Sequence, residues 1–235
     1  MKKIYYLLLT SALLMYACDD GKIYPKKVEE ATGKKVILNS TFTGINAWPK
    51  AYQLAIAGFG KDAQTPIISK TIAMPKNEAE TISLALNGIT DDITDISVCV
   101  MTTGRSLIHR FYNLNIADST NEVITLPIDK INVASFSRIQ NQVFNLYCSR
   151  CHGAGNFAAA DMYLTEGQSY EMLVNHLANT STSGKLRVKP GLIGSSFIHN
   201  VLTSDIIGYN HTDVLPEEEL VTLIDTWIEN GAKNN

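Results

Sequence analysis

The sequence lacks the features that mark nucleic-acid-binding, disordered and membrane-spanning proteins. Its 20 Lys and Arg residues are outnumbered by 23 Asp and Glu residues and form no basic stripe, so nucleic acid is not expected as a partner. With 45% hydrophobic and 18% charged residues, the composition is that of a globular protein rather than a disordered or fibrous one. No internal repeat or low-complexity segment interrupts it. One long apolar run, residues 4–15, is too short to span a bilayer comfortably.

This apolar run belongs to an N-terminal segment with the pattern of an export signal. Two lysines precede the run, and Ala17 and Cys18 follow it closely. The segment resembles a bacterial lipoprotein signal peptide, in which cleavage leaves the cysteine as an acylated N-terminus. We therefore predict a signal peptide over residues 1–17, lipidation of Cys18 and a lipid-anchored tether over residues 18–35. The alternative is an ordinary secretory signal in which the cysteine has no such role.

The start of the tether indicates a destination in the cell envelope. Asp19 and Asp20 follow Cys18 directly. Such acidic starts resemble those of Bacteroidetes-type lipoproteins, in which they accompany export to the outer-membrane surface. We therefore expect an outer-membrane lipoprotein that faces the periplasm or the cell surface. The lipid is expected to attach the protein to that membrane.

Residues 36–133 alternate between apolar and polar side chains, as strands with one buried face do. Turn-like segments, such as residues 117–121, separate the runs at the spacing of an all-β sandwich. We predict an N-terminal β-sandwich domain of immunoglobulin-like or transthyretin-like type over residues 36–133. Cys99 lies in one of the apolar runs and is expected to be a buried free thiol. The alternating positions include Val36, Leu38 and Phe42, then Tyr52, Leu54 and Ile56, then Ile96, Val98 and Val100.

Beyond Ser135 the apolar residues recur at three- and four-residue spacing, which predicts helices. A short helix is predicted after Ser169 and another after Ser195 or Ser196, each serine acting as a cap. The clearest helix has Pro216 in its first turn and three glutamates near its positive end. Its apolar stripe is Leu220, Leu223, Ile224, Trp227 and Ile228, and Gly231 ends it. The predicted fold class is therefore two-domain, with the β-sandwich followed by a small all-α domain over residues 134–235.

The segment Cys148-Ser-Arg-Cys151-His152 has the spacing of a c-type haem attachment site. Two thiols three positions apart can each add to a vinyl group on one porphyrin edge, and the adjacent histidine can bind the iron. A thioredoxin-like pair would instead follow a strand in a βαβ pattern, and a zinc site would need further nearby ligands. The pattern therefore predicts one covalent haem c, held by Cys148, Cys151 and His152.

Four segments around this motif resemble the single-haem cytochrome c domains that are abundant in Planctomycetes and Bacteroidetes. The resemblance covers about residues 136–233. It implies a small helical cytochrome c fold, with the first and last helices crossing beside the haem, and it implies nothing comparable about residues 36–133. The segments are Phe144–Gly153, Arg187–Gly191, Ser195–Ile198 and Trp227–Ala232.

The chain departs from this family at the expected sixth iron ligand. Many relatives carry a Met-Pro pair before the final helix, whereas this chain has no methionine after Met172. His211 lies close to the corresponding place, in residues 208–216, and is expected to bind the iron opposite His152. A second imidazole in place of a thioether should lower the reduction potential. If no side chain binds, the open position would suit a gas sensor or a weak peroxidase. The alternative ligands are His199, His176 and Met162.

These observations predict a monohaem c-type cytochrome lipoprotein that transfers electrons to or from redox partner proteins of the cell envelope. No enzymatic activity is expected, because the sequence offers no acid–base pair or substrate pocket. The alternative is a glycan- or partner-binding outer-membrane lipoprotein whose β-sandwich does the binding and whose haem domain is accessory. In that case Trp48 and Tyr52 would form an aromatic platform for a sugar.

Overall fold

The computed structural model describes residues 33–153 and 158–235. These residues belong to one compact unit. The predicted signal peptide, the lipidation site Cys18 and most of the predicted tether lie outside the described residues. Within the described ranges, no helix is both long and apolar enough to cross a membrane.

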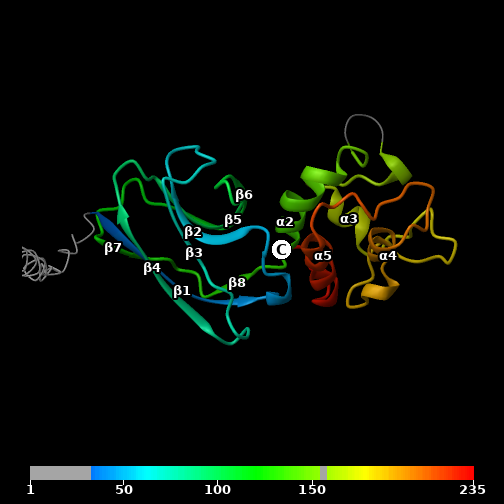
Figure 1. The fold of residues 1–235 in the computed structure, drawn as a ribbon, viewed down its shortest axis with the longest axis horizontal. Helices are drawn as coiled ribbons and strands as arrows, with labels where there is room; N and C mark the ends of the chain where they lie inside the picture. Colours follow the sequence, from blue (N-terminus) through cyan, green and yellow to red (C-terminus); the bar gives the residue numbers. More distant parts are fainter. Residues whose placement is uncertain (1–32, 154–157) are drawn as a thin grey trace, which may run out of the picture. The chain divides into compact units, whose positions relative to one another are not determined.

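Eight strands in the described chain form two sheets (Figure 1). In the first sheet, β1 pairs antiparallel with β4 and parallel with both β7 and β8. The second sheet is antiparallel throughout, in the order β3-β2-β5-β6. The strands are β1 (Lys34–Thr43), β2 (Gln53–Phe59), β3 (Ile68–Thr71), β4 (Thr81–Ile89), β5 (Asp95–Met101), β6 (Leu107–Asn115), β7 (Val123–Thr125) and β8 (Lys130–Asn132).

Alternation along the strands places one apolar face of each sheet against the other. Leu38 and Phe42 of β1 and Ile56 of β2 join one buried cluster, to which β4 and β5 also contribute. The opposite face of β2 and β5 is buried as well, in a smaller cluster that contains Phe59 and Cys99. Cys99 is a buried free thiol, as its apolar setting indicated, and burial raises its pKa to about 12.

The predicted small all-α cytochrome c domain is not present, and the predicted fold class is wrong on this point. The molecule is mostly β-sheet, and its described residues contain four short α-helices. A π-helix, η3 (Gln140–Cys148), continues the first of them. The helices are α2 (Phe136–Ile139), α3 (Ser169–Leu173), α4 (Phe197–Thr203) and α5 (Glu218–Glu229), with 3₁₀ turns η2 (Ile45–Ala47), η4 (Ala159–Asp161) and η5 (Ile193–Ser195).

The region around α3 shows why helical spacing was misleading. The helix ends after Leu173, because Val174 is extended and Asn175 has a φ of 59°. Val174 and Leu177 then form isolated bridges with Val188 and Leu186, so this part of the chain pairs as strands do, with Val174 half-buried and Leu177 exposed. Ser169 does not cap the helix, since Gln168 is the N-cap residue. A few apolar residues at three- and four-residue spacing fit both structures.

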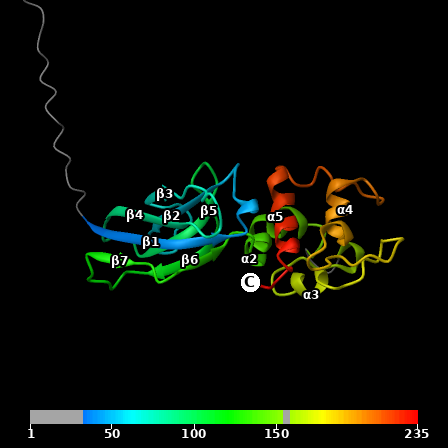
Figure 2. The same cartoon turned by 90° about the horizontal axis from the view of Figure 1, so that it is seen from below.

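The final helix, α5, has the apolar stripe that its sequence predicted, and all five stripe residues are buried. It begins at Glu218, so Pro216 precedes the helix instead of lying in its first turn. At its end, the N–H of Gly231 donates to the Ile228 carbonyl and that of Ala232 to the Trp227 carbonyl. These two bonds form a Schellman ending, in which Gly231 adopts a φ of 91°. Figure 2 shows α4 and α5 from below.

A buried arginine joins the strands to the helices. Arg138 of α2 is 1% exposed, and its Nη1 donates to the carbonyls of Ala47 and Val133, each at 2.8 Å. Its Nε donates to Gln142 Oε1 at 2.8 Å. Burial lowers the pKa of the guanidinium to about 10, so the group stays charged at neutral pH. At this junction, between β8 and α2, the chain changes from strands to helices. The predicted division into two domains at residue 134 stays a prediction.

Replacing this arginine should destabilise the protein strongly. Arg138→Ala leaves two buried carbonyls and the Gln142 amide oxygen without a donor, so the free energy of unfolding should fall by about 3 kcal/mol. Chemical denaturation of the purified protein measures this. The exposed variant Lys130→Ala should stay within about 0.5 kcal/mol of the wild type. An equally small effect of Arg138→Ala would contradict the role given to the junction.

His109 of β6 is the buried titratable imidazole of the strand region. It is 4% exposed, and its Nδ1 accepts a hydrogen bond from the Asn141 amide at 3.0 Å. Burial lowers its pKa from 6.5 to about 4, and the charge of Arg138 adds to this effect. Between these two pH values the unfolded chain binds a proton at His109 that the folded protein does not bind.

Stability should therefore decrease on acidification. The contribution of His109 is complete above about pH 6.5 and is lost as the pH falls towards about 4, by up to about 3 kcal/mol. His109→Gln removes the titrating group, so the difference in unfolding free energy between wild type and variant should change over this pH range. Denaturation curves at several pH values check this. If the unfolding free energies of the two proteins changed equally with pH, His109 would not be buried in its neutral form.

Candidate functional site

The helical region encloses an apolar cavity of about 620 Å³. Its volume lies within the range of about 300–1,000 Å³ that is usual for ligand sites. The walls come from η3, the segment that follows it, α4, the loop before α5, and α5 itself. Apolar wall residues include Val143, Phe144, Leu173, Ile198, Leu202 and Ile224.

The π-helix η3 places both predicted thiols on this cavity. It ends at Cys148. A π-helix has hydrogen bonds to the carbonyl five residues earlier, and the N–H of Ser149 donates in this way to the Phe144 carbonyl at 2.8 Å. The N–H groups of Cys151 and His152 both donate to the Cys148 carbonyl, so the chain forms a tight turn directly after the helix. π-helical turns are rare and occur often at functional sites. Among the residues that the structure describes, neither thiol is in a disulfide.

The two thiols differ in their surroundings. Cys148 is half-buried against the helical core, and burial, with the neighbouring Cys151, raises its pKa to about 12. Cys151 is exposed. One edge of a ligand held by both thiols would therefore face solvent, while the other parts would be surrounded by apolar side chains.

His152 lines the cavity in a fixed orientation. Its Nδ1–H donates to the Ala159 carbonyl at 2.9 Å, so the lone pair of the neutral ring is on Nε2, where a metal can bind. Burial lowers the pKa of the ring, which favours this neutral form. Gly153 follows with a φ of 138°, and a Cβ there would lie 2.6 Å from the Thr165 side chain. The turn after His152 therefore requires glycine.

His211 also lines the cavity, in the position that the sequence suggested for a sixth ligand. Its Nδ1–H donates to the Tyr209 carbonyl at 2.8 Å, which again leaves Nε2 available. The ring centroids of His152 and His211 are 6.4 Å apart, with 33° between the ring planes. A metal–imidazole bond is about 2 Å long, and the nitrogen lies about 1 Å from its ring centre, so two rings on opposite sides of one metal have centroids about 6 Å apart.

The alternative ligands have other environments. His199 of α4 bonds through Nδ1 to both carboxylate oxygens of Asp225 on α5, at 2.9 and 3.0 Å, and is not among the residues lining the cavity. Burial raises the pKa of Asp225. His176 is exposed and is not a lining residue. Met162 does line the cavity and stays an alternative.

A buried cation completes the site. Arg187 is 4% exposed and lines the cavity, while its guanidinium donates to the carbonyls of Met172 and Ala160 at 2.8 and 3.1 Å. From the sequence, the basic segment with Lys185, Arg187 and Lys189 could either neutralise acidic substituents of a haem or form an exposed turn. The position of Arg187 between the apolar residues Leu186 and Val188 was the available signal for its burial.

These residues fit a c-type haem. Two thiols stand at one side of the cavity, two imidazoles have the separation of opposite ligands of one metal, and a guanidinium can pair with acidic substituents. The arrangement brings together Cys148, Cys151, His152 and His211. Cys18 lies outside the described residues.

The aromatic platform suggested for a sugar is not available at Trp48. This side chain is 7% exposed and packs edge-on against Phe42, with ring centroids 5.4 Å apart. Tyr52 is half-buried and packs against the cores of both the strand and the helical regions.

Comparison with protein-family models, with curated proteins and with solved structures found no match to this chain.

Proposed function

We propose that this protein binds one covalent haem c and carries electrons in the bacterial cell envelope. The observation that supports this most is the pair of imidazoles, 6.4 Å apart, on an apolar cavity that Cys148 and Cys151 also line. The spacing of the cysteine motif and the distance between the histidines are independent observations, and both fit a c-type haem.

In this proposal Cys148 and Cys151 hold the haem by thioether bonds, and His152 and His211 bind its iron. When bound, the haem supplies a one-electron couple. The protein fixes both imidazoles through their Nδ1–H bonds and excludes water with apolar side chains. Arg187 can compensate for the charge of the acidic substituents.

Electron transfer suits these residues better than catalysis. If His152 and His211 both held the iron, no position would stay open for a substrate or a gas. Two imidazole ligands also favour a lower reduction potential than an imidazole and a thioether. Cys151 and Tyr209 line the cavity and are exposed, so a redox partner protein can approach the cofactor closely at this side.

The proposal includes anchoring through Cys18, in keeping with the export signal of residues 1–17. A lipid at this cysteine would hold the electron carrier at the outer membrane, near its redox partners. Attachment of haem through thioethers is also an advantage in an exported protein, since a covalently held cofactor cannot diffuse away.

Removing the proposed sixth ligand should change the spin state of the iron. The mature protein, produced with a cytochrome c maturation system, should give a sharp low-spin α band on reduction, whereas His211→Ala should give a high-spin spectrum. His176→Ala, which replaces an exposed histidine outside the cavity, is the matched control and should keep the low-spin spectrum.

The outcomes separate the parts of this proposal. An unchanged low-spin spectrum for His211→Ala would assign the sixth ligand to another side chain, with Met162→Ala as the next variant. If the wild type carries no covalent haem under these conditions, the proposed function is wrong.

Anchoring has a separate test. Cys18→Ala removes the acylated residue, so the protein should move from the membrane fraction to the soluble fraction of fractionated cells. Immunoblotting with metabolic lipid labelling measures both properties. A variant that stays in the membrane fraction and a wild type without label would together refute lipidation.

A further inference from the structure

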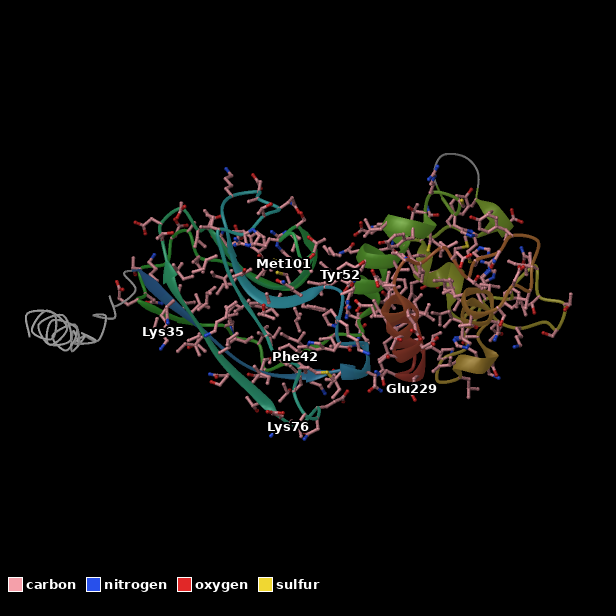
Figure 3. All side chains as sticks on the ribbon, in the orientation of Figure 1. Lys35, Phe42, Tyr52, Lys76, Met101 and Glu229 are labelled. Carbon is pink, nitrogen blue, oxygen red and sulfur yellow. The ribbon has the colours of Figure 1, made fainter. Side chains whose placement is uncertain are left out.

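The side chain of Gln140, the first residue of η3, makes three hydrogen bonds and is 5% exposed. Its Nε2 donates to the Leu164 carbonyl at 3.0 Å and to Asn145 Oδ1 at 2.7 Å. Its Oε1 accepts a hydrogen bond from the hydroxyl of Ser169, the first residue of α3, which is 1% exposed. Both elements belong to the helical region, whose side chains are drawn in Figure 3. The amide of Gln140 thus uses both of its hydrogens and its oxygen.

The surroundings of this amide allow one orientation. In the reverse orientation, Oε1 of Gln140 would face the Leu164 carbonyl oxygen, and neither oxygen can donate a hydrogen bond. The hydroxyl of Ser169 supports the observed orientation by donating to Oε1 on the other side. Because buried carbonyl groups require a donor, the Leu164 carbonyl depends on this amide.

Leu164 connects Gln140 with the proposed iron ligand. It is 3% exposed and lines the cavity, and its N–H donates to the His152 carbonyl at 2.7 Å. Gln140 therefore holds the carbonyl side of Leu164, while the N–H side of Leu164 holds the backbone of His152. The imidazole of His152 is fixed separately, through the bond from its Nδ1–H to the Ala159 carbonyl at 2.9 Å.

We propose that Gln140 is a positioning residue for the iron ligand His152 and acts through Leu164. This inference rests on the proposed function. Groups beyond the ligands themselves orient a metal's ligands and affect how firmly they bind. By keeping the His152 backbone in place, Gln140 keeps the imidazole where it can bind the iron. The π-helix then serves the site at both ends, because Gln140 at its start supports the ligand and Cys148 at its end holds the haem.

The test compares Gln140→Leu with Gln142→Leu in the mature protein, produced with a cytochrome c maturation system. Gln142 is also buried in η3, but its Oε1 accepts from Arg138 Nε at 2.8 Å, so its variant controls for a general loss of stability. Gln140→Leu removes the donor to the Leu164 carbonyl. Relative to the amides of α5, hydrogen exchange of the Leu164 N–H should therefore become about tenfold faster. Gln142→Leu should leave this ratio close to that of the wild type.

Carbon monoxide measures the effect on the iron. It binds a ferrous haem that has two imidazole ligands only after one of them has left, so faster binding reports a ligand that is held less firmly. Gln140→Leu should bind carbon monoxide several-fold faster than both the wild type and Gln142→Leu. Ser169→Ala, which removes only the hydroxyl bonded to Oε1, should change both measurements in the same direction.

Equal exchange ratios, or equal binding rates for carbon monoxide, in Gln140→Leu and Gln142→Leu would overturn the proposal. If Gln140→Leu does not fold, the comparison of Ser169→Ala with the wild type decides. A wild type without covalent haem would refute the proposed function. A low-spin haem whose binding of carbon monoxide is the same in all variants would refute the positioning role alone.

Discussion

The guanidinium of Arg138 is the contact on which the other features of the fold depend most. It stands where β8 gives way to α2, and two of its bonds reach carbonyls of the strand region, at Ala47 and Val133. Its third bond is to Gln142, which lies in η3, so the same side chain ties the strand region to the π-helix. That helix in turn carries Cys148 to the cavity. A buried charge seldom stabilises a protein more than a well-packed apolar group would, but it strongly favours one arrangement of its partners.

The cavity lies beside the apolar core of the helical region, which supplies Val143, Phe144, Leu173, Leu202 and Ile224 to its wall. Around it, the helical elements are short, and several stretches have only isolated bridges to hold them. Small units with few regular elements are often stabilised by a disulfide, a metal or a cofactor. A large apolar cofactor would therefore contribute to folding as well as to redox chemistry. The helix α5, with 12 residues the longest of the described α-helices, provides with its buried stripe the regular surface against which the irregular segments pack.

The sequence predicted some features well because they depend on neighbouring residues. The stripe of α5, its glycine ending and the alternation of β1, β2 and β5 are of this kind. The cysteine motif follows from local sequence and His211 was suggested by the resemblance. The structure brings both to one cavity, while their role in holding a haem stays a prediction. The all-α fold was wrong because it was transferred from a resemblance and from sparse spacing. Val174 and Leu177 instead form isolated bridges with Val188 and Leu186, which lie 14 and 9 positions further along the chain.

Other features were beyond prediction because they depend on contacts between distant residues. The bond from Arg138 to the Ala47 carbonyl and the packing of Tyr52 against both cores each join segments that no local pattern relates. The π-helix is a similar case, since the difference between it and an α-helix is one residue in each hydrogen-bonded ring.

The loop that carries His211 is built almost entirely from bonds between residues two positions apart. Tyr209 accepts from the imidazole, and Asn210 Oδ1 accepts both the N–H and the hydroxyl of Thr212. These bonds fix the orientation of the ring within a few residues, so part of its conformational entropy is lost when the loop forms. A metal bound at a histidine prepared in this way would require little further ordering, and the free energy of coordination would then be expressed as affinity.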